Sequence, residues 1–110
     1  MNRVWDERGF EDFIMLRDKL RLAKREKKYQ DVIDLGIKIV EIDEYSKTLK
    51  ICTPIFYKDI GEAGLKLGDT ELALKYFILA KNGFLEYRIS DFEWQKDIDV
   101  LDKKIEKLQK

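Results

Sequence analysis

Histidine is absent from this 110-residue chain, and cysteine and proline occur once each, as Cys52 and Pro54. The absence of histidine removes the commonest general base and metal ligand. A single cysteine cannot form an internal disulfide bond, which agrees with a reducing compartment, and Cys52 has no histidine to activate it as a nucleophile. We therefore predict that the protein is not an enzyme and uses neither a cofactor nor a metal ion.

A charge excess of one sign and a long apolar run are also lacking. The 22 Lys and Arg residues balance 22 Asp and Glu residues, so no overall field attracts the chain to nucleic acid or to a membrane. The longest stretch without a charged residue, Ile51–Tyr57, is far shorter than the ~20 apolar residues of a membrane-spanning helix. The first residues lack the apolar core of a signal peptide, so we expect a cytoplasmic protein without a membrane segment.

The residues that are present favour an all-α single domain covering 1–110. Charged residues make up 40% of the chain, well above the roughly 25% of a typical soluble domain, and few Gly or Pro interrupt the sequence. Apolar residues recur at steps of three and four, which indicates amphipathic helices. We expect disorder before residue 9 and five helices, covering about 10–28, 29–44, 53–67, 70 onward to either 83 or 89, and 91–109.

Local signals mark several helix ends. Thr53 and Pro54 supply a capping hydroxyl followed by proline at the first helical position, which predicts the start of the third helix. Gly68 can adopt the left-handed conformation that ends this helix, and Asp69 can cap the fourth helix. Residues 90–93, Ser-Asp-Phe-Glu, form a capping box before the fifth helix. The fourth helix is apolar nearly all round, so we predict that it is the most buried.

The segment from Tyr57 to Ala80 resembles one tetratricopeptide repeat. Its first half carries an aromatic residue and a small residue at the family positions, and Ala73 and Phe77 reproduce the Ala-x3-Phe spacing of the second helix. Gly64 stands where the family has tyrosine, which leaves an expected packing gap. The resemblance implies antiparallel helical hairpins of an α–α superhelix, with a clear repeat at about 55–85 and a degenerate one at about 13–43.

The resemblance also implies a binding groove, because the first helix of each tetratricopeptide repeat lines the concave face. In this register the groove residues are Arg17, Arg21, Lys24, Lys58 and Glu62. The three cations of the first helix follow an i, i+4, i+7 spacing and so share a face. They are suited to an acidic or C-terminal carboxylate segment. We therefore expect an adaptor or scaffold whose partner is a protein or peptide of unknown identity.

Two other functions remain open from the sequence. Residues 17–28 hold seven cations and two acids, and this basic helix could bind nucleic acid or serve a regulatory role, although the balanced total charge weighs against it. An enzyme or small-ligand receptor would need a pocket, for which the aromatic candidates are Tyr57, Tyr76, Phe77 and Trp94. Such aromatic residues are more often part of the core.

The last predicted helix carries an apolar seam at alternating steps of four and three. Its members are Trp94, Ile98, Leu101, Ile105 and Leu108. The seam either belongs to a capping helix that covers the second hairpin or forms a two-fold homodimer contact. Because repeat arrays normally need about three repeats and only two are recognisable here, we expect at least weak self-association.

Overall fold

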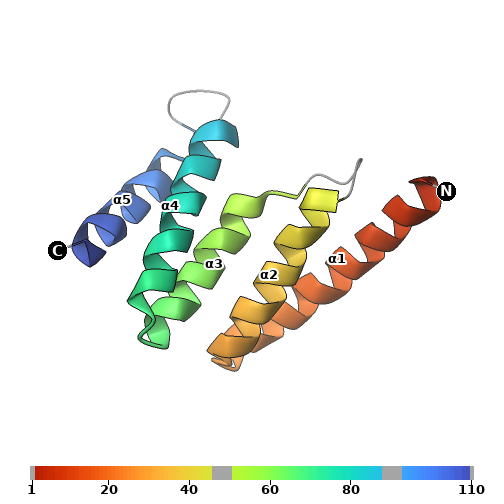
Figure 1. The fold of residues 1–110 in the computed structure, drawn as a ribbon, viewed down its shortest axis with the longest axis horizontal. Helices are drawn as coiled ribbons and strands as arrows, with labels where there is room; N and C mark the ends of the chain where they lie inside the picture. The colour runs from red at the N-terminus through yellow and green to blue at the C-terminus, as the bar shows by residue number, and fades with distance from the viewer. Residues whose placement is uncertain (1, 46–50, 88–92, 110) are drawn as a thin grey trace.

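The computed structural model describes residues 2–45, 51–87 and 93–109, with side chains from Gly9 to Glu44 in the first of these ranges. In the described residues the chain forms helices joined by turns and short connections, which confirms the all-α fold class (Figure 1). The helices are α1 (Asn2–Arg25), α2 (Tyr29–Tyr45), α3 (Thr53–Lys66), α4 (Thr70–Tyr87) and α5 (Gln95–Leu108).

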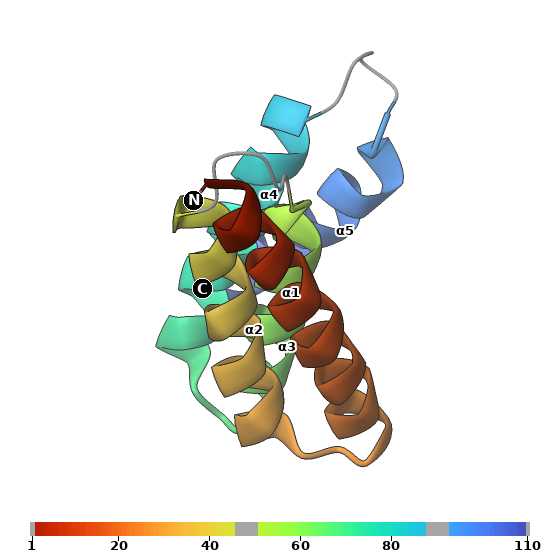
Figure 2. The same cartoon turned by 90° about the vertical axis from the view of Figure 1, so that its right-hand side faces the viewer.

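Each helix packs against the next one in the chain, and successive helices run in opposite directions, so the five form a row of antiparallel hairpins. The row fills a slab of 49 × 35 × 20 Å. Side-chain contacts also join helices two apart, since Lys24 of α1 bonds Asp59 of α3, and Glu62 of α3 bonds Lys104 of α5. The helices α1, α3 and α5 therefore share one layer, while α2 and α4 lie on the other side (Figure 2).

The turn between α3 and α4 follows its sequence signals. Gly68 has a φ of 80°, the left-handed conformation that ends a helix with little cost for glycine. The next residue caps α4, because the backbone N–H of Leu72 donates to Oδ1 of Asp69 at 3.1 Å. The prediction for Gly68 and Asp69 is therefore confirmed.

Close approach explains the small residues inside this hairpin. A Cβ atom added at Gly61 would lie 2.7 Å from the ring of Phe77, and Ala73 is fully buried. The packing gap expected at Gly64 is absent, because a Cβ atom there would lie 2.6 Å from Cδ2 of Leu72. Leu72 thus occupies the space that a tyrosine at position 64 would otherwise take.

Several predicted helix ends differ from the structure. Cys52, not Thr53, is the N-cap residue of α3, and no side chain caps this helix, since Thr53 is already helical and buried. α1 begins at Asn2, as no proline interrupts residues 2–8, and α4 continues to Tyr87. α5 begins at Gln95, not at residue 91, because Trp94, its N-cap residue, has a left-handed φ of 62° that a regular helix does not contain. The capping box expected at residues 90–93 falls mostly outside the described residues.

The most buried helix is α3 rather than α4, contrary to the prediction. Eight residues of α3 are buried, against four of α4. The reason is position: α3 packs between α2 and α4 and also meets side chains of α1 and α5. The apolar residues Leu79, Leu85 and Tyr87 of α4 are exposed by 36%, 37% and 44%.

Two apolar clusters hold the row together. The first joins α1, α2 and α3 around residues such as Leu20, Ile39 and Ile60, which are at most 2% exposed. The second joins α4 and α5 around Phe77 and Leu101, both fully buried. The half-buried ring of Tyr57 packs against both clusters, so the core continues through the middle of the row.

Candidate binding cleft between α1 and α3

A cleft of about 340 Å³ opens between α1 and the first turns of α3. Its apolar floor includes Phe13 and Phe56, whose rings meet edge to face with centroids 5.9 Å apart. The full lining is Phe13, Arg17, Leu20, Arg21 and Lys24 from α1, Ile51 and Cys52 before α3, and Ile55, Phe56 and Asp59 from α3. Three of the five predicted groove residues therefore meet in one cleft.

Two arginine side chains border this cleft without a strong internal partner. The guanidinium carbon of Arg17 lies 5.8 Å from the centroid of the Phe13 ring, and its only described ion pair is a 3.5 Å contact with the neighbouring Asp18. The Nε atom of Arg17 is buried and has no hydrogen-bond partner in the described part of the chain. Arg21 is exposed and forms no ion pair within the described residues. Both guanidinium groups can therefore donate to a ligand.

Lys24, the third cation, is already engaged at the floor of the cleft. Its Nζ atom donates to Oδ1 of Asp59 at 2.9 Å. Asp59 is only 9% exposed, and burial raises the pKa of its carboxyl group, although the hydrogen bond and charge of Lys24 act in the opposite direction. This pair leaves the cleft with an excess of two positive charges, both on arginine.

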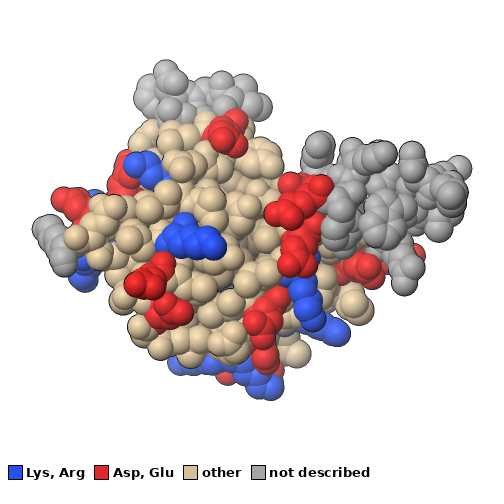
Figure 3. Space-filling view, in the orientation of Figure 1, with Lys and Arg blue, Asp and Glu red and all other residues tan. Residues whose placement is uncertain are grey.

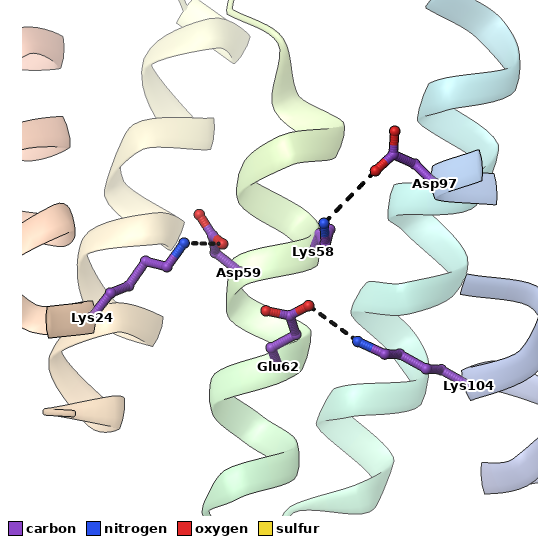
Figure 4. A network of polar contacts seen from close by, with 6 residues as sticks. All are labelled: Lys24, Lys58, Asp59, Glu62, Asp97 and Lys104. Carbon is purple, nitrogen blue, oxygen red and sulfur yellow. Dashed lines mark hydrogen bonds and ion pairs between the residues drawn. The ribbon is translucent and has the colours of Figure 1, made fainter. Parts of the chain in front are cut away.

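The two predicted groove residues of α3 lie outside this cleft. Lys58 pairs with Asp97 of α5 at 3.8 Å, and Glu62 accepts a hydrogen bond from Lys104 of α5 at 3.1 Å (Figure 4). Glu62 also lines a smaller cleft of about 120 Å³ together with Lys24. Both side chains therefore lie in the layer of α1, α3 and α5. They bond to α5 and do not line the cleft that contains Arg17 and Arg21.

Sequence reasoning did not select Asp59, Phe13 or Phe56 as site residues. The i−3 and i+4 neighbours of Asp59 on α3, Phe56 and Ala63, are both buried, and this spacing was the available signal that Asp59 points inward.

Cys52 lines the cleft, and its surroundings do not activate the thiol. Its side chain is half-buried, and burial raises the pKa of the thiol. The reactive form of cysteine is the thiolate, so a raised pKa lowers reactivity at neutral pH. This agrees with the interpretation of Cys52 as a packing residue.

The aromatic residues considered for a ligand pocket pack inside the molecule. Phe77 is fully buried, and the half-buried rings of Tyr57 and Tyr76 lie 5.9 Å apart. Trp94 packs on Phe84 at a centroid distance of 5.1 Å. These contacts are the ordinary packing of a helical core.

The apolar seam of α5 faces α4. Ile98 and Leu101 are 3% and 0% exposed, and Trp94, Ile105 and Leu108 pack partly buried against the same cluster. Lys81 of α4 and Asp102 of α5 add an ion pair at this contact. The helix therefore covers the end of the α3–α4 hairpin, and a dimer through the seam would have only its three half-buried side chains to use.

The fold and cleft define the chain as an all-helical row of antiparallel hairpins with a charged cleft on one layer. No protein-family model, curated protein or solved structure matches this chain. None of the helices in the described ranges is long and apolar enough to cross a bilayer. Those ranges also contain no group of three or more His, Cys, Asp or Glu residues placed to hold a metal ion.

Proposed function

We propose that this protein is a non-catalytic, tetratricopeptide-like interaction module that holds a segment of a partner protein in the cleft between α1 and α3. The observation that carries the proposal is the combination of an apolar floor, formed around Phe13 and Phe56, with two arginine side chains at its border, of which Arg17 has, among the residues described, only a 3.5 Å ion pair with the exposed Asp18. Small-molecule and peptide sites typically pair an apolar surface with a few convergent polar groups.

The hairpin formed by α3 and α4 supports the comparison with tetratricopeptide repeats. The close approach of Gly61 to Phe77 and the fully buried Ala73 give physical reasons for the residues that match the family pattern. The helix α3 also lies in the layer that the family uses for its groove. The partner is therefore expected on the face formed by α1, α3 and α5.

The cleft chemistry favours a partner segment that presents an apolar side chain beside a carboxylate. The apolar side chain would pack on Phe13, Ile55 and Phe56, and the carboxylate would accept charge-assisted hydrogen bonds from Arg17 and Arg21. Asp59 does not oppose an anion strongly, because Lys24 already neutralises it at 2.9 Å.

A peptide-display library panned on the full chain tests the proposal. Peptides selected on the wild-type protein should carry acidic and apolar residues, and the Arg17→Glu/Arg21→Glu variant should bind them at least tenfold more weakly, the scale of a lost charge-assisted contact. The matched control is Arg25→Glu/Lys103→Glu, which makes the same charge change at two exposed residues outside the cleft. Equal losses in both variants would contradict the proposal, as would a library that yields no binder.

The placement of the cationic side chains of residues 17–28 favours a peptide partner over a nucleic acid. Arg17 and Arg21 border the cleft, Lys24 is bound to Asp59, and Lys19 and Lys28 line a different groove between α1 and α2. Figure 3 shows the opposite face, formed by α2 and α4, where acidic and basic side chains are both present. A gel-shift assay tests this alternative. Binding that weakens steeply with salt would indicate a nucleic-acid partner.

A further inference from the structure

The end of the row formed by α1 and α2 is not covered by another described helix, whereas α5 covers the opposite end (Figures 1 and 2). A groove of about 390 Å³ runs along this open end. Leu22, at its centre, is 49% exposed, and Met15, one heptad earlier on α1, is 48% exposed. Repeat arrays need a polar outer face on their terminal elements, so exposed apolar side chains here indicate a surface with a partner.

The groove is built from one face of each helix. α1 contributes Lys19, Leu22, Ala23 and Glu26, and α2 contributes Asp31, Asp34, Leu35 and Lys38, while Lys28 lies in the turn that joins them. On both helices these residues follow the i, i+3, i+4, i+7 pattern of a single face. This face of α1 points away from the cleft, whose residues on α1 are Phe13, Arg17, Leu20, Arg21 and Lys24.

The charges in the groove are separated along its length. Glu26 and Asp31 lie next to the turn with one cation, Lys28, which pairs with Glu26 at 3.6 Å, and Asp34 lies near the middle of the groove. The half farther from the turn holds Lys19 and Lys38, and neither forms an ion pair within the described residues. Lys19 and Glu26 are seven positions apart on α1, so they are separated by about 10 Å along the helix axis.

We propose that this α1–α2 groove is the contact of a two-fold homodimer. A two-fold axis through the centre of the groove places the acidic half of one copy over the basic half of the other, and it brings the exposed Leu22 side chains together. One groove therefore supplies both complementary charges and the apolar centre. The contact is independent of the peptide cleft and of the α5 seam.

Sedimentation equilibrium of the full chain tests this dimer with two charge variants. Lys19→Glu/Lys38→Glu makes the whole groove acidic, and Asp31→Lys/Asp34→Lys makes it basic. Like charges then oppose each other across the axis, so each variant alone should raise the dimer Kd at least tenfold. An equal mixture of the two variants should restore association as a heterodimer, which native mass spectrometry can identify.

A further variant and three controls complete the test. Leu22→Lys places a charge at the apolar centre of the contact and should also raise the dimer Kd at least tenfold. As the first control, circular dichroism checks that all variants remain helical. Arg25→Glu/Lys103→Glu lies outside the groove and should leave the Kd unchanged. The groove variants should keep the peptide affinity of the wild-type chain, which separates this proposal from the proposed function.

A wild-type chain that stays monomeric up to about 1 mM, the weak limit of specific association, would overturn the proposal. A dimer that persists in both charge variants would also overturn it and would direct attention to the α5 seam. Failure of the variant mixture to associate, while the wild type does, would show that the opposed charges are not in contact.

Discussion

The carboxylate of Asp59 lies at the floor of the cleft, 2.9 Å from the ammonium group of Lys24, but the two side chains are buried to very different degrees. The side chain of Asp59 is 10% exposed and that of Lys24 is 48% exposed. Water can therefore solvate Lys24 when its partner is removed, whereas Asp59 has little access to water. The two halves of this ion pair should not be equivalent.

We predict that Lys24→Ala destabilises the protein more than Asp59→Asn does. Removal of Lys24 leaves a buried carboxylate without its cation, at a cost of about 1–3 kcal/mol, whereas Asp59→Asn should cost about 1 kcal/mol or less. Urea unfolding of both variants measures the difference. Equal costs would mean that Asp59 is better hydrated than its burial indicates.

The stability contributed by Asp59 should also depend on pH. Burial raises the pKa of Asp59 in the folded protein above its ordinary value of 3.8. Between the unfolded-state pKa and this higher folded-state pKa, the folded protein binds more protons than the unfolded chain. The free energy of unfolding contributed by Asp59 therefore falls as the pH rises through this window. An asparagine side chain cannot ionise, so the stability of Asp59→Asn relative to wild type should increase from about pH 4 to about pH 7.

Urea titrations of wild type and Asp59→Asn at each pH give this difference directly, because the other titrating groups are common to both chains. A difference that is constant with pH would show that Asp59 is not desolvated. A change of the opposite sign would show that Lys24 outweighs burial in setting the pKa.

Gly61→Ala should destabilise the protein by about 1–3 kcal/mol, the usual cost of overpacking. The new Cβ atom would lie 2.7 Å from the Phe77 ring. Phe77→Leu should reduce this cost when the two changes are combined, because the smaller side chain no longer fills the space. Thermal or urea unfolding of the single and double variants measures the coupling.

Gly68→Ala is the matched control for this coupling. No heavy atom lies within 4 Å of a Cβ atom at Gly68, but its φ of 80° strains other residues, so the change should cost about 1 kcal/mol. Phe77→Leu should leave the cost of Gly68→Ala unchanged. Coupling of equal size at both glycines would contradict the close approach of α3 and α4.

Leu101→Ala should destabilise the protein by about 2–5 kcal/mol, because this fully buried side chain joins α5 to α4. Val100→Ala, at the adjacent position that is 41% exposed, should stay within about 0.5 kcal/mol of wild type. Calorimetry compares the two. Similar melting temperatures for both variants would mean that α5 does not stabilise the row.

Sequence reasoning predicted the features of this fold that are local. The Gly68–Asp69 turn and the close packing at Gly61 follow from neighbouring residues, as does the apolar seam of α5. Trp94 was missed as the N-cap residue of α5, because its left-handed conformation is unusual for a large side chain and accompanies packing on Phe84.

The candidate site could be predicted only in part. The spacing of Arg17, Arg21 and Lys24 fixed their common face on α1, and the structure brings all three to one cleft. The pairing of Lys24 with Asp59 joins residues 35 positions apart, and the pairing of Glu62 with Lys104 joins residues 42 positions apart. Such partners depend on how helices two apart are placed, which helical periodicity does not determine.

The most direct test of the proposed binding function is an amide chemical-shift map of the full chain titrated with a peptide selected from the display library. Binding in the cleft predicts that the largest shifts fall on Phe13, Arg17, Arg21, Ile55 and Phe56, with little change along the exposed face of α4 near Leu79 and Leu85. Shifts centred on that α4 face, with the cleft residues unmoved, would contradict the account.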